Sequence, residues 1–521
     1  MIRTGDQYRC SIRGTREVYL DGARVDDVTT HAAFKPLVDI RARIYDMQHD
    51  PAHRDVLSFR DAGETCAVAS KLPFSQEDWW AKRRATERVL DLAGGVVTRV
   101  GDETVGEIWS LHDAADALNE LDGRFAQNIQ RHIAHVTRGD PFHVSANADP
   151  GAGRVCPPQG QNPDAQLHVV RETDAGLVVR GAKFETAAAY ANQAFTKPTI
   201  TEWGEGALSD HAVGFICDLN APGLRFICRS GFAGRAPARD YPLSNRFDEV
   251  EALVVFDDVL IPWENVLFHR HTRAAMFLRA TLHRYSAFAF VQRNLRLADM
   301  LIGAALLNLR QSGLDRLQPV QGKLAELACY RETINAHLTA AIALAEKSPG
   351  GLMMPNQSLL YTGRHLACSQ LHHMMHLARE LCGGQIALTP SAAAFEAPET
   401  APWLEKYYTL NDEWLAEDRR KLMAFARDLL NSDHAAHRLT FQLFAEGPPH
   451  THLAAIYRNF DWSGPLDLVR RSADLPERVP GPATCTQGDS ALSRWFALQA
   501  PHARGPGTGA PVPAGGARDR P

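Results

Sequence analysis

The stretch FDDVLIPWENVLFHRH (residues 256–271) lies where one kind of sequence pattern gives way to another. Before it, short apolar and β-branched runs such as ALVVF (252–256) alternate with turn-forming residues, a pattern typical of β-strands. After it, apolar residues recur at helical spacing over long segments. The stretch interrupts its own apolar run with Asp257 and Asp258 and then turns at Pro262, whose ring fixes φ. It therefore predicts the end of a β domain, with Glu264 or Asn265 capping the next helix.

The composition argues against several classes of protein. With 521 residues, 45% hydrophobic and 22% charged, the chain is long enough for two or three domains with a large core. Its formal net charge of −5 leaves no basic excess for a nucleic acid or an anionic membrane. The N-terminus is polar and no apolar run reaches the ~18 residues of a membrane span, so we expect a cytoplasmic protein without a signal peptide. The nine cysteines include no C-x-x-C pair, which argues against a disulfide framework or a zinc ribbon.

The first half of the chain shows two of four parts. Residues 1–140 are typical of a helical domain. Helices are expected in 31–50 and 75–95, with one or two more in 104–139. Ser75 is the expected N-cap of the second helix, and glycine follows its end. Residues 141–269 are typical of a compact antiparallel β domain, in which TDAG (173–176) joins two strands in a tight turn.

Residues 270–455 predict a four-helix bundle, because long amphipathic segments are separated by short Gly, Pro and Ser breaks. These segments are 271–311, 320–347, 357–384 and 412–433. Residues 456–521 form a C-terminal extension that is rich in Pro, Gly and Ala at its end and is expected to be disordered from about residue 500. No G-x-G-x-x-G follows a predicted strand, so a Rossmann site for flavin or nicotinamide is not expected.

Helices, then a small β domain, then a four-helix bundle is the order of elements in the acyl-CoA dehydrogenase architecture, which binds flavin between the β domain and the bundle. Three further stretches carry a closer resemblance: 4–34 (TGDQYRCSIRGTREVYLDGARVDDVTTHAAF), 172–188 (ETDAGLVVRGAKFETAA), and YPLSNRFDE (241–249) together with VVFDDVLIPWENVLFHRH. In these stretches, and from about residue 4 to about residue 450, the chain resembles the large oxygenase component of two-component 4-hydroxyphenylacetate 3-monooxygenases.

The resemblance implies an α+β fold of the acyl-CoA dehydrogenase type. It also implies a reduced-flavin-dependent monooxygenase that hydroxylates a phenolic or amino-acid-derived aromatic substrate through a flavin C4a-hydroperoxide. The FAD would arrive as FADH2 from a separate flavin reductase, and the protein would be a homotetramer. The segment 256–271 would then leave the β domain beside the flavin, with Asp257, Asp258 and Glu264 in structural roles.

By the same resemblance, the family holds its phenol with an arginine, a tyrosine four residues later, and a histidine about forty residues further on. Arg99 matches the arginine, Glu103 stands in place of the tyrosine, and His143 matches the histidine. Hydroxylation beside a phenolic oxygen is faster when that oxygen is negatively charged, and guanidinium and imidazole donors stabilise such a charge. His143 could also accept the phenolic proton. Alone, Arg99 would be interpreted as a surface arginine near a glycine turn.

The distal part of the family's substrate pocket falls on Thr201 and Glu202, counted without gaps from Gly181. Two carboxylates, Glu103 and Glu202, would then face a pocket that the family keeps neutral. Such a pair suits a substrate that bears an amine, such as an amino acid or its carrier-bound form. The alternative is that one or both carboxylates point to solvent.

The resemblance also suggests flavin contacts. These are His143, Asn147, Thr186, Ala187, Gly383, Gly384, Gln385, Phe441 and Phe444. Gly383 and Gly384 would let the backbone approach a pyrophosphate closely, although the same pair could simply end a helix. The match of FQLFAEG (441–447) to an aromatic turn of the family is loose.

Three other interpretations are open. A 4-hydroxybutyryl-CoA dehydratase of this fold would need iron–sulfur ligands at Arg99, Glu103, His283 and Phe290, of which only the histidine is suitable. A flavin-dependent acyl-CoA dehydrogenase-like oxidoreductase would need a catalytic carboxylate in the bundle, and the N-terminal signature argues against it. A non-catalytic binding protein remains the third alternative, because Glu103 departs from the family. No metal is predicted: His372 and His376 share a helix face with no nearby carboxylate pattern, which favours packing or an interface.

Overall fold

The computed structural model describes the backbone of residues 2–14, 16–98, 102–146, 148–150, 162, 164–198, 208–445 and 447–475. The predicted disordered tail from about residue 500 lies outside these residues. The contacts divide the chain into two units, Met1–Asn459 and Phe460–Pro521. The described part of the second unit contains one helix, α18 (Ser463–Ser472). The first unit contains all the other helices and strands of the described residues.

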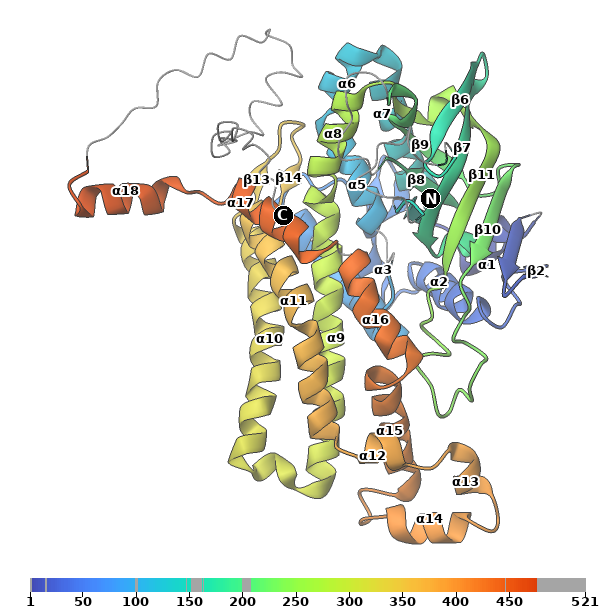
Figure 1. The fold of residues 1–521 in the computed structure, drawn as a ribbon, viewed down its shortest axis with the longest axis vertical. Helices are drawn as coiled ribbons and strands as arrows, with labels where there is room; N and C mark the ends of the chain where they lie inside the picture. The colour runs from blue at the N-terminus through green and yellow to red at the C-terminus, as the bar shows by residue number, and fades with distance from the viewer. Residues whose placement is uncertain are drawn as a thin grey trace, which may run out of the picture. The chain divides into compact units, whose positions relative to one another are not determined.

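The N-terminal helices lie beside the β domain and the bundle, where α7 contacts β12 and α5 contacts both β5 and α9 (Figure 1). They are α1 (Gly5–Ile12), α2 (Lys35–Met47), α3 (Arg54–Leu57), α4 (Gln76–Ala93), α5 (Asp102–Asp113), α6 (Ala115–Leu121) and α7 (Gly123–Gly139). Ser75 caps α4 as predicted, since its side chain accepts a hydrogen bond from the backbone N–H of Asp78, and Gly94 ends the helix in the left-handed conformation. The predicted one or two helices in 104–139 are three, because Asp122 begins a new helix by capping α7.

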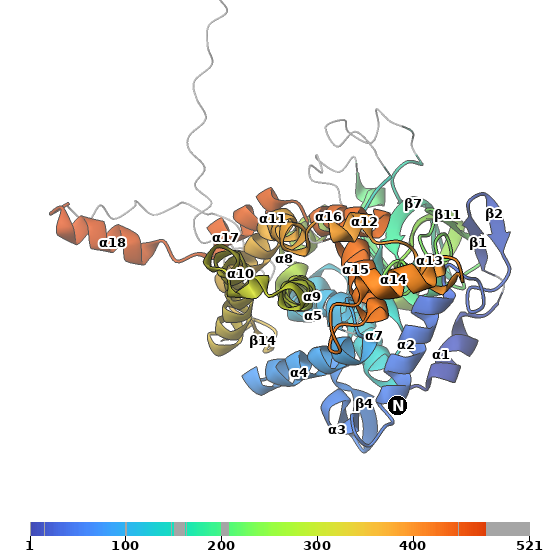
Figure 2. The ribbon, with the colours of Figure 1, turned by 90° about the horizontal axis from the view of Figure 1, so that it is seen from below.

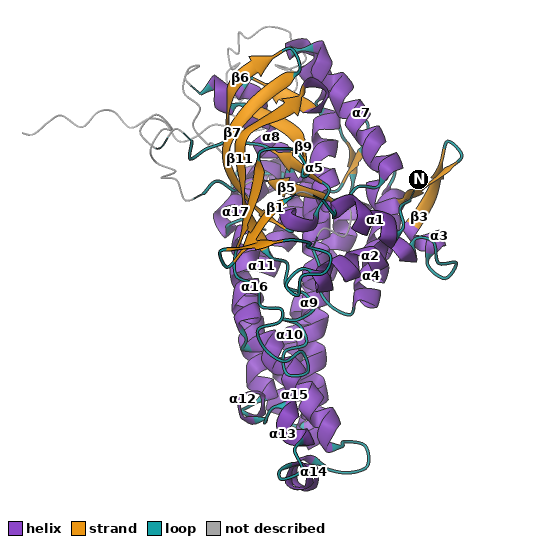
Figure 3. Cartoon of the chain, turned by 90° about the vertical axis from the view of Figure 1, so that its right-hand side faces the viewer, coloured by secondary structure: helices purple, strands orange, loops and turns teal. Residues whose placement is uncertain are grey.

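Two sheets form the β domain (Figure 3). The six-stranded sheet has the order β2 (Ala23–Val25), β1 (Glu17–Leu20), β10 (Leu224–Cys228), β11 (Glu251–Pro262), β7 (Gly176–Thr186) and β6 (His168–Thr173). The four-stranded sheet has the order β12 (Val266–His269), β9 (Val213–Asp218), β8 (Gln193–Thr196) and β5 (His143–Ala146). A separate hairpin joins β3 (Ser58–Asp61) and β4 (Glu64–Ala67).

Two pairings depart from the predicted antiparallel domain. β1 pairs with β10 in parallel, and β5 pairs with β8 in parallel. The first pairing also means that the N-terminal region is not wholly helical, because residues 17–25 complete the β-domain sheet. The predicted hairpin at 173–176 is present between β6 and β7. Glycine is required there, since a Cβ on Gly176 would lie 2.0 Å from the carbonyl oxygen of Ile261.

The two aspartates of 256–271 form a β-bulge in β11. The register with β7 shifts between Phe256 and Val259, and Asp258 has a φ of 53°. Exposed arginines neutralise both carboxylates: Arg225 Nη1 lies 2.7 Å from Asp257, and Arg180 binds Asp258 through Nε and Nη2. These contacts are structural.

The element after the bulge differs from the prediction. It is not a helix but a 3-10 turn (Trp263–Asn265) that enters β12, so neither Glu264 nor Asn265 caps a helix. The Asn128 amide of α7 holds this turn by donating to the carbonyl oxygens of Trp263 and Val266. Helix α8 (Thr272–Thr281) begins only afterwards.

The bundle consists of α9 (His283–Ser312), α10 (Gln318–Ala343), α11 (Gln357–Cys382) and α15 (Ala416–Leu430), as the sequence predicts. Figure 1 shows the first three alongside one another, and Figure 2 looks along their axes, with α5 next to α9. Shorter helices surround them: α12 (Gln385–Leu388), α13 (Ala392–Glu396), α14 (Ala401–Tyr408), α16 (Asp433–Phe444) and α17 (Pro449–Asn459). None of the helices in the described segments is both long and apolar enough to span a bilayer.

The stretch 241–249 ties the β domain to the bundle through a buried carboxylate. Asp428 of α15 is fully buried and accepts hydrogen bonds from the backbone N–H groups of Leu243 and Ser244 and from the Ser244 hydroxyl. A buried carboxylate with three donors is well compensated for its lost hydration. The loop is therefore fixed relative to the bundle.

Candidate functional site

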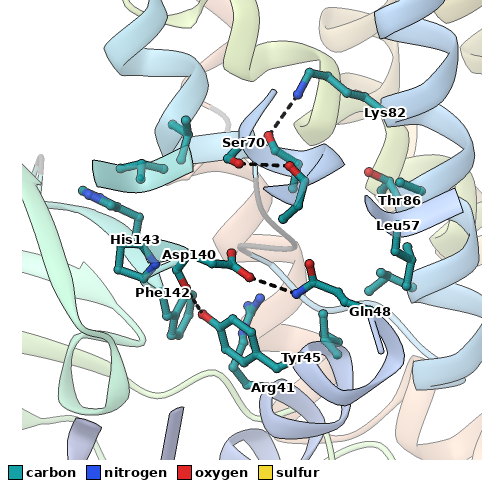
Figure 4. Close-up of a pocket in the computed structure, with 18 residues that line it drawn as sticks. Arg41, Tyr45, Gln48, Leu57, Ser70, Lys82, Thr86, Asp140, Phe142 and His143 are labelled. Atoms are coloured by element: carbon teal, nitrogen blue, oxygen red, sulfur yellow. Dashed lines mark hydrogen bonds between the residues drawn. The ribbon is translucent and has the colours of Figure 1, made fainter. Parts of the chain in front are cut away.

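His143 lies in β5, at a small internal cavity between α2, α4 and α7 (Figure 4). The cavity has a volume of about 60 Å³, which has room for a few water molecules but not for an aromatic ring. Nε2 of His143 lies 2.9 Å from Nε2 of His132, and both rings are buried. Burial lowers the pKa of His143 to about 3. His143 is therefore neutral near pH 7, where its environment favours a hydrogen-bonding role over that of a proton acceptor.

Three such histidines should make the protein sensitive to acid. Burial lowers the pKa of His132 well below its usual value and that of His434 to about 3, as for His143. As the pH falls, these histidines are protonated in the unfolded chain at a higher pH than in the folded protein. The free energy of unfolding is therefore unaffected by them above about pH 6.5. It falls as the pH drops toward 3, by up to ~1.4 kcal/mol per pH unit for each group. We expect a lower melting temperature at pH 5 than at pH 7. We also expect a smaller difference in His143→Gln, and an equal difference would contradict the assignment.

The residues just before Arg99 are held in place by buried charges. Glu249 accepts hydrogen bonds from the Thr98 backbone N–H at 2.7 Å and from its hydroxyl at 2.5 Å. Arg41 donates to the Thr98 carbonyl oxygen at 3.0 Å, and Arg438 of α16 donates to that of Val96 at 3.1 Å. Arg99 itself lies outside the described residues. The backbone that enters it is thus fixed from the N-terminal domain, the β domain and the bundle together.

A buried cluster of polar side chains surrounds Glu107, which lies on α5 one helical turn after Glu103. Glu107, which is 1% exposed, accepts a hydrogen bond from the Ser145 hydroxyl at 2.6 Å and forms an ion pair with Lys197. The Lys197 ammonium also donates to Ser145 Oγ at 2.7 Å. The other Glu107 oxygen lies 3.7 Å from Nδ1 of His283, the first residue of α9. The cluster therefore joins α5, β5, the end of β8 and α9.

This cluster brings together the elements that lead to most of the predicted substrate residues. Glu103 lies on α5 one turn before Glu107, although its side chain is not described. Asn147 follows β5, and Thr201 and Glu202 follow β8; all three lie outside the described residues. Because β5 and β8 run parallel, the two segments that follow them leave the sheet at the same end of the strands. The predicted substrate segments thus start from one place, although the sequence alone did not single out Glu107, Ser145 or Lys197.

Thr186 and Ala187, predicted to contact flavin, end β7 and are buried. Ala187 has a φ of 67° and donates its N–H to the Val250 carbonyl oxygen. A non-glycine residue in the left-handed region is strained, and such residues collect at functional sites. The conformation is compatible with a backbone contact to a ligand.

Gly383 and Gln385 lie at the opposite end of α9 from His283 and the Glu107 cluster. Gly383 ends α11 with a φ of 68°, which agrees with the helix-end interpretation of the glycine pair. Gly383 and Gln385 line a groove of about 620 Å³ with Asn308, Lys323 and Arg419. Asn308 donates to the carbonyl oxygens of Leu381 and Cys382. Asn308 lies 25 residues after His283 on α9, a rise of about 37 Å. One flavin is too short to reach from this turn to the Glu107 cluster of the same chain. As flavin contacts, Gly383, Gly384 and Gln385 remain predictions.

Comparison with known proteins decides the family. A family described as 4-hydroxyphenylacetate 3-hydroxylase N terminal matches residues 4–268, and one described as 4-hydroxyphenylacetate 3-hydroxylase C terminal matches residues 272–474. The chain belongs to the 4-hydroxyphenylacetate 3-hydroxylase family. The match covers both sides of the junction at 256–271.

Individual members of the 4-hydroxyphenylacetate 3-hydroxylase family are similar over most of the chain. The oxygenase component of 4-hydroxyphenylacetate 3-monooxygenase from Thermus thermophilus is 29% identical over 468 residues, 88% of this chain and 95% of that protein. A monooxygenase of Streptomyces globisporus that acts on a carrier-bound (3S)-3-amino-3-(3-chloro-4-hydroxyphenyl)propanoyl group is 31% identical over 82% of each chain. A solved structure of an oxygenase component complexed with FAD and 4-hydroxyphenylacetate superposes with a TM-score of 0.84 at 27% identity, covering 91% of this chain and 98% of that one.

Phe441 and Phe444, which were predicted to lie in a turn that contacts the flavin, lie on a helix. Residues 441–444 form the last turn of α16, and the loop begins only after Phe444. Phe441 is 1% exposed and packs near Arg438 and His437. The side chain of Phe444 is not described. As a flavin contact, Phe441 remains a prediction.

The histidines considered as metal ligands are surface residues of α11. His372, His373 and His376 are exposed, and His373 lies 2.7 Å from Glu326 of α10. Within the described ranges, no group of three or more His, Cys, Asp or Glu side chains could hold a metal ion. His283 and Phe290 stand at positions where the dehydratase has cluster ligands. His283 lies near the polar side chains of Glu107 and Ser286, whereas Phe290 only packs against its ring.

Proposed function

We propose that this protein is the oxygenase component of a two-component monooxygenase, which uses reduced FAD to hydroxylate a phenolic ring. The observation that carries the proposal is the family match across both halves of the chain, together with the close superposition on an oxygenase that holds FAD and 4-hydroxyphenylacetate. The convergence of the predicted substrate segments on the Glu107 cluster supports it.

When bound, reduced FAD supplies the centre that activates oxygen. Thr186, Ala187 and Asn147 are the proposed contacts to its ring system, with His143 behind them as a neutral hydrogen-bonding group. Arg99 would hold the phenolic oxygen, since a guanidinium offers two parallel donors and keeps its charge. Glu103, Thr201 and Glu202 would line the distal part of the pocket, where two carboxylates suit a substrate amine. The Streptomyces relative, whose substrate is an amine-bearing carrier-bound phenol, supports that choice.

The separation along α9 supports an oligomer. The turn at 383–385 lies next to Asn308, which is about 37 Å along α9 from His283 of the Glu107 cluster, more than one flavin can span. We propose that this turn contacts the pyrophosphate of a flavin held by a neighbouring copy, as in a homotetramer. Arg419 lines the same groove and would balance phosphate charge, whereas Lys323 there is already paired with Glu380.

The reductase would be a separate protein, because the chain shows no Rossmann fingerprint for a nicotinamide. A reducing compartment, the cytoplasm, is consistent with seven free cysteines among the described residues.

The test is product formation with the partner supplied. The purified chain, FAD, NADH and a separate flavin reductase are mixed in air with a panel of phenols and aromatic amino-acid derivatives. We expect a product heavier by one oxygen atom, seen by mass spectrometry, and only when the reductase is present. Stoichiometric NADH oxidation by the purified chain alone would overturn the two-component proposal.

A further inference from the structure

Exposed leucines surround the groove at the 383–385 turn. Leu314 and Leu410 line the groove, and both are exposed to solvent. Leu388, which is 71% exposed, lies beside the turn, since its Cδ1 is 3.8 Å from the position that a Cβ on Gly384 would occupy. A single exposed leucine is ordinary, but three around one groove leave a group of apolar side chains in water.

The same surface continues onto α14, which lies beyond the end of the bundle, two residues before Leu410 (Figure 1). Trp403 and Tyr407 are four residues apart and therefore share one face of this helix, where they are 60% and 68% exposed. The helix is held from another side, where the Tyr408 ring meets the Phe395 ring edge-on at 5.1 Å. The face with Trp403 and Tyr407 is thus left to solvent in one chain.

The groove patch, as we call these side chains together, consists of Leu314, Leu388, Trp403, Tyr407 and Leu410. An eight-residue helix such as α14, which has no buried residue, gains little stability from its own chain. Tryptophan and tyrosine are the residues that most often dominate the binding energy of protein interfaces. Exposed charged residues border the patch, among them Glu405, Lys406 and Asp412. An apolar, aromatic centre with a charged border is the composition of a protein–protein interface.

The occupant that fits this surface is a second copy of the chain. Asn308 in the groove is about 37 Å along α9 from His283 of the Glu107 cluster, a distance that one flavin does not span. A flavin contact at 383–385 therefore requires the substrate site of another copy, which must lie against the groove and the side chains around it. A separate reductase has no such requirement, because it only has to deliver reduced FAD.

We propose that the groove patch is a surface on which a second copy of this chain docks, with Trp403 and Tyr407 as the main anchors. The choice of a second copy rests on the proposed function, because the shared flavin selects it. The patch adds to that function the surface, and the residues, that hold two copies together.

The test is the molar mass of the purified full chain, measured by analytical ultracentrifugation over a range of concentrations. Trp403→Glu and Tyr407→Glu each place a charge in the contact. Each should raise the dissociation constant of the assembly by roughly 30-fold or more, as expected for an interface anchor. Trp403→Phe keeps an apolar ring and should retain most of the association. Because both side chains are exposed in a single chain, the circular dichroism spectrum should stay the same in all three variants.

The matched control is Phe74→Glu. Phe74 is also an exposed aromatic residue, but it lies at the other end of α10 from the groove, where its carbonyl oxygen accepts a hydrogen bond from Lys347. Its substitution should leave the molar mass unchanged. An unchanged mass in both Trp403→Glu and Tyr407→Glu would overturn the docking surface. A wild type that is monomeric, including one that gains mass only when a flavin reductase is added, would overturn it as well.

Failure of the proposed function has its own readouts. FAD should tighten the assembly of the wild type, because a ligand that two copies share stabilises their association. If Trp403→Glu dissociates the assembly and FAD leaves the dissociation constant of the wild type unchanged, the docking surface stands and the shared flavin fails. A wild type that hydroxylates no phenol with FAD, NADH and a reductase removes the monooxygenase function, whatever its molar mass.

Discussion

Replacing Arg99 with lysine is expected to lower kcat/KM by roughly 30- to 1000-fold, equivalent to ~2–4 kcal/mol of lost transition-state stabilisation. Lysine keeps the positive charge but loses the planar pair of donors that can hold a phenolic oxygen in one orientation. The backbone that enters position 99 is held by Glu249, Arg41 and Arg438, so a lysine would start from the same point and reach the substrate with one donor group only.

The melting temperature should change little, because Glu249, Arg41 and Arg438 hold this segment through the backbone of Val96 and Thr98. Steady-state kinetics with reductase and reduced FAD, together with calorimetry, check both parts. Arg84→Lys is a suitable control, since Arg84 is an exposed residue of α4 that pairs with Glu77. An unchanged kcat/KM in Arg99→Lys would remove Arg99 from the mechanism.

The second large effect is expected at Glu103, where the chain departs from its family. A tyrosine donates a hydrogen bond to the substrate, whereas an ionised glutamate only accepts one. If Glu103 binds a substrate ammonium, Glu103→Tyr should lose the amine-bearing substrate and gain simple phenols such as 4-hydroxyphenylacetate. A charge-assisted hydrogen bond of ~1.5–3 kcal/mol corresponds to roughly a ten- to hundredfold change in preference.

The measurement is the ratio of kcat/KM values for an amine-bearing phenol and for 4-hydroxyphenylacetate. Glu103→Gln is the matched control, because it removes the charge while keeping the size. It should weaken the amine-bearing substrate without improving the simple phenol. The amine hypothesis is wrong if the wild type already hydroxylates 4-hydroxyphenylacetate well and the tyrosine variant does no better. The alternative is that Glu103 pairs with Arg99, four residues earlier in the sequence.

Local signals in the sequence predicted much of the fold. Ser75 and the glycine after α4 mark a helix whose ends depend only on residues within one turn. The TDAG turn joins β6 and β7 directly, so this hairpin is also visible in the local sequence, whereas the close approach of Ile261 to Gly176 is not. The four long helices of the bundle were visible because their apolar period extends over many turns. These features depend on neighbours in the chain, which a sequence displays directly.

The rest depends on residues that are distant in sequence. Glu107, Ser145 and Lys197 come from three elements, and no spacing rule connects them. Glu264 or Asn265 was predicted to cap the next helix because of residue type, but the edge of β9 was available and the chain formed β12 against it. The family resemblance predicted His143 as a donor to the phenolic oxygen that could also accept its proton. Its burial beside His132, which makes it a weak base, is a tertiary property.

The parallel pairing of β1 with β10 has a consequence for the behaviour of the chain outside its native state. β10 is the inner neighbour of β1, and its Leu224 and Phe226 are buried. If residues 17–25 detach, β10 becomes an edge strand whose backbone N–H and C=O groups can pair with a strand of another molecule. The N-terminal strands thus cover this edge of β10, and we expect their loss to favour self-association of the sheet.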